Sequence, residues 1–142
     1  HLGTLSIDFL DANRGGKKEN QIHYAPPWNH GFDVSFATES KVPTWDPMIT
    51  PNHSAGDVKS SLVEGGFFGT SYWTGPGERV NQNLNGDDSK IIMDRVIPFI
   101  EESASQNQKF LSVIWFHAPH LPVLNGKKYK SLYSELSEDQ QH

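Results

Sequence analysis

The chain has 142 residues, of which 35% are hydrophobic and 20% charged, and it carries a formal net charge of −5 at pH 7. This size and balance fit one globular domain, and the scattered lysines leave no basic patch for nucleic acid or an anionic membrane surface. No apolar run approaches the roughly 18 residues of a membrane-spanning helix, so no membrane span is expected. The chain contains no cysteine, which excludes a disulfide framework, a thiolate zinc site and a cysteine nucleophile.

The first part of the chain is predicted to be mostly irregular. Residues 11–90 are rich in Gly, Pro, Asn and Trp, and only residues 34–37 suggest a short strand. Trp45 and Trp73 are candidate stacking platforms for sugar rings, although packing of the loops explains them slightly better. So much irregular chain indicates either a functional loop region or a part of something larger.

Residues 89–103 are predicted to form an amphipathic helix, because apolar side chains recur there at helical spacing. Asp88 or Ser89 is the expected N-cap, and the acidic residues favour a helix start. Pro98 lies inside this stretch and is expected to kink or shorten the helix. A second, short helix is expected within residues 128–136.

Between these helices lies the most apolar stretch of the chain, residues 110–116, in which Ser112 is the one polar side chain. Such a run is typical of a strand buried on both faces within a parallel sheet. Pro119 and Pro122 lack the N–H that pairing requires, so the strand should end near His117. His117 and His120 would then lie beyond the carboxyl end of a strand, where open α/β sheets bind their ligands.

Two histidines at this place can bind an oxyanion and transfer a proton to a leaving oxygen. A zinc site at the same pair is a weaker alternative, because zinc usually takes three or four protein ligands. For His117 alone, a satisfied histidine at the sheet edge is an equally good interpretation. His120 lies farther from the strand and is the better candidate for chemistry.

Four segments, taken together and in this order, resemble the sulfatase family. The start of the chain is similar to the end of the family's Gly-Lys-Trp-His-Leu-Gly signature, and residues 115–122 are similar to its aromatic-x-Ala-Pro-His-x-Pro strand end. Residues 29–33 resemble its Gly-Phe-Asp stretch, and residues 86–100 resemble the helix that precedes the strand.

The resemblance implies an α/β fold, part of an alkaline-phosphatase-like α/β/α sandwich with a mainly parallel central sheet and long irregular loops. It implies hydrolysis of sulfate esters by a formylglycine nucleophile, with sulfated small molecules or polysaccharides as substrates. His1 would correspond to the family's histidine that contacts the formylglycine hydroxyl. His120 would contact the sulfate and protonate the leaving alcohol, while His117, Trp45 and Trp73 are candidate substrate contacts.

Several parts of the family's machinery have no counterpart in the sequence. There is no Cys/Ser-x-Pro-x-Arg motif for the formylglycine, and the Ca²⁺ ligands implied by the resemblance are absent, so no metal ligand is assigned. We therefore expect residues 1–142 to be a partial catalytic domain that lacks the nucleophile region and a C-terminal portion. Such a chain should be inactive alone and should self-associate through its apolar strand. The family would imply a periplasmic, secreted or lysosomal location.

Two alternatives remain open besides the zinc site. One is a phosphodiesterase or phosphonate hydrolase of the same superfamily. The other is a non-catalytic glycan-binding module that uses Trp45 and Trp73.

Overall fold

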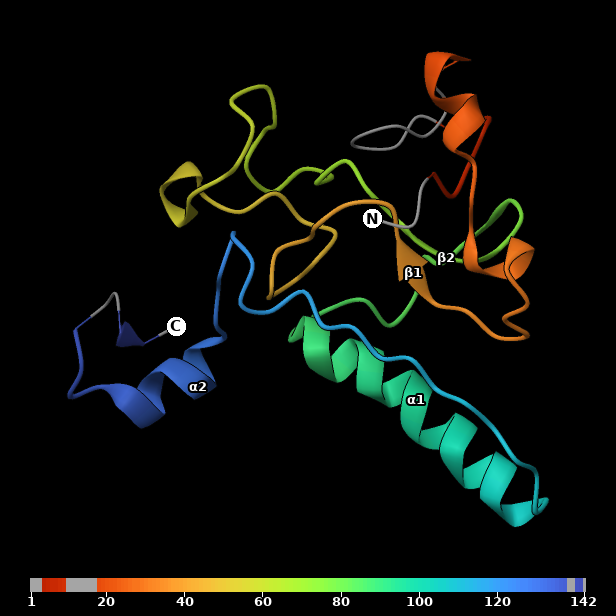
Figure 1. Cartoon of the computed structure of the whole chain (residues 1–142). Helices are drawn as coiled ribbons and strands as arrows, with labels where there is room; N and C mark the ends of the chain where they lie inside the picture. The colour runs from red at the N-terminus through yellow and green to blue at the C-terminus, as the bar shows by residue number, and fades with distance from the viewer. Residues whose placement is uncertain (1–3, 10–17, 138–139, 142) are drawn as a thin grey trace.

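A computed structural model describes residues 4–9, 18–137 and 140–141, and it contains both helices and a small β-sheet (Figure 1). The fold is therefore of mixed α and β type. In chain order the elements are η1 (Lys18–His23), η2 (Pro27–Asn29), β1 (Ala37–Thr38), η3 (His53–Ala55), β2 (Tyr72–Gly75), β3 (Glu78–Arg79), α1 (Asp88–Ser105), α2 (Lys127–Lys130) and η4 (Ser131–Tyr133).

The described sheet has three short antiparallel strands in the order β1-β2-β3. In its register Ala37 lies opposite Trp73, and Thr38 lies opposite Tyr72. The strand expected at residues 34–37 therefore overlaps β1 only at Ala37. The parallel central sheet is not among the described residues.

The core lies where β2 packs on the first turns of α1. The Phe36 ring stacks on the Tyr72 ring, with centroids 4.0 Å apart and planes 6° from parallel. The guanidinium carbon of Arg95 lies 4.0 Å from the Phe36 centroid, so a cation from α1 extends this stack. The core residues and the side chains packed against them are Tyr72, Leu84, Ile91, Phe36, Met48 and Val80.

Helix α1 confirms the helix expected at residues 89–103. The expected N-cap, Asp88 or Ser89, is wrong: the N-cap is Asp87, whose carboxylate accepts hydrogen bonds from the backbone N–H groups of Ser89 (2.8 Å) and Lys90 (3.2 Å). The helix continues through Pro98 for seven further residues, so the proline does not shorten it. The second expected helix is present in its first part, as α2 followed by η4.

The prediction that residues 110–116 form a buried strand is wrong for the described chain. These residues leave the end of α1 and run back beside it (Figure 1), with the Phe110 and Phe99 rings 5.4 Å apart. No described residue pairs with them as a strand. Leu111 is 81% exposed and Trp115 66% exposed. An apolar run favours burial, but a ladder also requires a neighbouring strand, and the described strands pair with one another instead.

Within the described residues, no helix is both long enough and apolar enough to cross a lipid bilayer.

Candidate functional site

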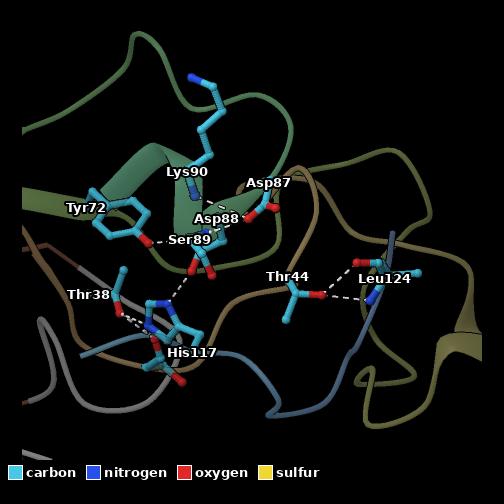
Figure 2. Close-up of polar contacts among 10 residues, drawn as sticks. Thr38, Thr44, Tyr72, Asp87, Asp88, Ser89, Lys90, His117 and Leu124 are labelled. Carbon is cyan, nitrogen blue, oxygen red and sulfur yellow. Dashed lines mark hydrogen bonds and ion pairs between the residues drawn. The ribbon is translucent and has the colours of Figure 1, made fainter. Parts of the chain in front are cut away.

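His117 lies at the centre of a polar cluster that joins four separate parts of the chain (Figure 2). Its Nδ1 atom is 2.8 Å from one carboxylate oxygen of Asp88, and its Nε2 atom is 2.9 Å from the hydroxyl of Thr38. The hydroxyl of Tyr72 donates a hydrogen bond to the other carboxylate oxygen of Asp88. The cluster therefore holds the end of the 110–116 segment against the small sheet and the start of α1.

Secondary structure explains why these side chains meet. Thr38 in β1 and Tyr72 in β2 are direct partners in the sheet register, so they are cross-strand neighbours. Asp88 is the first residue of α1 and is only 1% exposed. Its carboxylate lies at the N-terminal end of the helix, between the Tyr72 hydroxyl and the His117 ring.

Counting donors and acceptors assigns the proton positions in the cluster. The Thr38 hydroxyl has one hydrogen, which it donates to the carbonyl oxygen of Ser40 at 2.7 Å, so it accepts from Nε2–H of His117. The Asp88 carboxylate accepts from the Tyr72 hydroxyl with one oxygen, and its other oxygen faces Nδ1 of His117. The polarity of the His117–Thr38 hydrogen bond is opposite to a catalytic triad, in which the histidine accepts a proton from the hydroxyl.

Tyr72 is held in its protonated form. Burial raises the pKa of the Tyr72 hydroxyl far above its usual range, and the adjacent Asp88 carboxylate raises it further. The cationic Arg95 opposes this change only in part. Burial also lowers the pKa of Arg95. Tyr72 therefore serves as a hydrogen-bond donor to Asp88, as the proton count requires.

His120 is exposed and lies on a turn that begins at His117. Its backbone N–H donates to the carbonyl oxygen of His117 at 2.7 Å, and its ring Nδ1 is 2.7 Å from the carbonyl oxygen of Leu121. A carbonyl accepts, so Nδ1 carries the hydrogen. The Nε2 atom makes no hydrogen bond to any described residue and can exchange a proton with a ligand.

The chain is also anchored on the other side of His120. The backbone N–H of Thr44 donates to the carbonyl oxygen of Pro122 at 3.1 Å. The Thr44 hydroxyl donates to the carbonyl oxygen of Leu124 at 2.8 Å and accepts from its N–H at 2.7 Å (Figure 2). The His120 turn is thus fixed at both ends.

The two candidate tryptophans differ in their surroundings. Trp73 is 2% exposed in β2, and its ring packs against Phe9 at 5.7 Å, so it presents no face for stacking. Trp45 is half-buried and lines a hollow at the start of α1. His1 lies outside the described residues, so the structure does not place it relative to His120.

The structure adds Thr38, Tyr72 and Asp88 to the site. The only sequence signal for them was the helix-start pattern at Asp88, which marked a cap and gave no indication of a histidine partner. In the described parts of the chain, no group of three or more His, Asp or Glu side chains is arranged to hold a metal ion. Both ring nitrogens of His117 already have protein partners, which leaves a zinc ion no free ligand atom on this ring.

The chain matches no protein-family model, no curated protein and no solved structure. Its function must therefore be argued from its motifs and from the geometry of the His117–His120 turn.

Proposed function

We propose that this chain belongs to the catalytic domain of a sulfatase, a sulfuric ester hydrolase with an alkaline-phosphatase-like α/β/α architecture. One observation carries the proposal. His120 presents an unpaired Nε2 atom from a turn that is anchored at both ends, within the segment that resembles the family's strand end.

In this proposal His120 is the group that contacts the sulfate. With both ring nitrogens protonated, its Nε2–H donates to the ester oxygen of the leaving alcohol, and the proton passes to that oxygen as its bond to sulfur breaks. His117 does not contact the ester, because Asp88 and Thr38 occupy both of its ring nitrogens. It acts as a positioning residue that fixes the turn on which His120 lies. His1 supplies a further contact near the nucleophile, as the resemblance implies.

The nucleophile has to come from chain outside these 142 residues, which contain neither a cysteine nor a Cys/Ser-x-Pro-x-Arg motif. Formylglycine, when present, supplies the hydroxyl that attacks sulfur. The chain alone should therefore have no sulfatase activity.

The finer fold is also part of the proposal. A mainly parallel central sheet would need strands from outside the described chain. Residues 110–116 are largely exposed, and none of their backbone N–H and C=O groups bonds to a described residue, so they leave an apolar surface on which such a sheet could pack.

A phosphodiesterase or phosphonate hydrolase of the same superfamily is the enzymatic alternative, because the same histidines would suit a phosphoryl oxygen. The glycan-binding alternative used Trp45 and Trp73 as stacking surfaces. Trp73 is buried and cannot stack on a sugar. Trp45 retains an accessible position beside a hollow.

The first test is the coding sequence upstream of His1. The proposal predicts a Cys/Ser-x-Pro-x-Arg motif there, and the longer gene product should hydrolyse an aryl sulfate. Hydrolysis of an aryl phosphonate with no turnover of the sulfate would favour the phosphonate hydrolase and overturn the choice made here.

A further inference from the structure

A hollow of about 360 Å³ lies at the start of α1, next to the His117 cluster in sequence but separate from it. Asp87 borders the hollow, whereas the following residue, Asp88, bonds to His117. The hollow is lined by Trp45, Asn83, Asn85, Gly86, Asp87, Lys90, Ile91, Asp94 and Tyr129.

One wall of the hollow is aromatic and closely packed. The Trp45 and Tyr129 rings meet edge to face, with centroids 6.0 Å apart and planes at 71°. Trp45 also lies so close to Gly126 that a Cβ atom there would be 2.2 Å from the indole ring. An isolated antiparallel bridge joins Trp45 to Asp87. The wall is therefore held in place relative to α1.

The polar groups of the hollow include three that are free to bind a ligand. The side-chain amides of Asn83 and Asn85 and the hydroxyl of Tyr129 make no hydrogen bond to any described residue. The carboxylate of Asp87 accepts two bonds from the start of α1 and has acceptor capacity left. Amide and hydroxyl groups both donate and accept, as sugar hydroxyls do.

The charge of the lining argues against an anionic ligand. Its charged side chains are the two carboxylates of Asp87 and Asp94 and the ammonium of Lys90. Lys90 is already paired with Asp94. A sulfate group here would meet the remaining negative charge of Asp87 without a free cation to balance it.

We propose that this hollow is a subsite for a neutral sugar ring. The apolar C–H face of the sugar packs on Trp45 and Tyr129, while its hydroxyls bond to the amides of Asn83 and Asn85. The inference rests on the proposed function in one respect: it names the substrate class as an oligosaccharide in which a neutral residue accompanies the sulfated residue at His120.

Binding can be measured on this chain by NMR, following the indole N–H signal of Trp45, which a Trp45→Phe variant assigns. The probes are a neutral galactose oligosaccharide, the same oligosaccharide carrying sulfate on every residue, and inorganic sulfate. The neutral probe should shift the Trp45 signal in a saturable way. The other two should leave it unchanged at equal concentration.

Asn85→Ala and Tyr129→Ala should each weaken binding of the neutral probe about 3- to 10-fold, the loss expected for one hydrogen bond or ring contact. Asn81→Ala is the matched control, since Asn81 is exposed and does not line the hollow. Trp115→Ala controls for stacking on an exposed tryptophan elsewhere.

A Trp45 signal that does not move with the neutral probe, or that responds equally to the fully sulfated one, overturns the subsite. Equal weakening by Trp115→Ala also overturns it. None of these results bears on hydrolysis of an aryl sulfate, which needs no sugar, so the subsite and the sulfatase proposal fail independently.

Discussion

The sequence position of His117 indicated that this residue is important, but it did not predict which residues His117 contacts. Its place after an apolar run and before two prolines identified it as chemically interesting. Its partners Asp88 and Thr38 lie 29 and 79 residues away, and no local pattern predicts contacts at such separations. His120, expected to lie beyond the strand end, is exposed on a turn between two prolines.

The Asp88–His117 pair should contribute strongly to stability. Asp88→Ala removes both carboxylate acceptors and leaves the His117 and Tyr72 donors unsatisfied, so the free energy of unfolding should fall by about 3 kcal/mol. Asp94→Ala, which removes an exposed carboxylate from the same helix, should change it by less than about 1 kcal/mol. Urea unfolding of both variants measures the difference. Equal losses of unfolding free energy in the two variants would show that the Asp88–His117 pair stabilises the fold no more than an exposed carboxylate does.

The raised pKa of Tyr72 predicts a loss of stability at high pH. The folded chain holds the Tyr72 proton, whereas the unfolded chain releases it above about pH 10. This contribution to stability is complete below about pH 10 and declines as the pH rises further. In urea titrations between about pH 9 and 11, Tyr72→Phe should be less stable at pH 9 and should show a shallower decline. Parallel curves for the two proteins would contradict this account.

At the level of elements, α1 was predicted well and residues 110–116 were not. Helix α1 has local causes: capping by Asp87, apolar spacing and hydrogen bonds within one segment. A strand depends on a partner that can lie anywhere in the chain, or outside it. The apolar pattern of residues 110–116 therefore indicated that the segment favours burial. The described chain does not bury it.

The N-cap of α1 provides a test of whether contacts within the helix segment itself stabilise α1. Asp87→Ala removes an acceptor for two backbone N–H groups and should reduce the free energy of unfolding by about 1 kcal/mol. Glu101→Ala changes an exposed carboxylate farther along the same helix, and it should have an effect within about 0.5 kcal/mol. Thermal unfolding followed by circular dichroism at the helix signal distinguishes the two. A larger loss for Glu101→Ala would mean that the cap is not the controlling contact.

For the whole molecule, the outstanding feature is apolar surface concentrated on one extended segment. Leu111, Val113, Trp115 and Phe116 are each at least 46% exposed, and the neighbouring backbone is unpaired within the described residues. Exposed apolar residues gathered in this way mark an interface. Among the described residues the segment runs beside α1 (Figure 1), yet these four side chains stay largely exposed.

The purified chain should therefore self-associate through residues 110–116. Light scattering during gel filtration should show a molecular mass above that of one chain, increasing with concentration. Replacing Leu111 and Trp115 together by serine should reduce the association. Leu132→Ser, which removes a leucine 69% exposed on η4, should leave it unchanged. A monomeric chain with a cooperative thermal transition would contradict the expectation.

The central proposal is that His120 transfers a proton in sulfate ester hydrolysis. The most direct measurement is kcat for an aryl sulfate, made on a protein that carries this chain together with the upstream motif that the proposal requires, with and without His120→Ala. We predict turnover in the unchanged protein and a loss of about 10² to 10⁴-fold in the variant, with the effect reduced for an ester whose leaving group needs no proton. An unchanged kcat in His120→Ala, or no aryl sulfate turnover by the unchanged protein, would contradict the account.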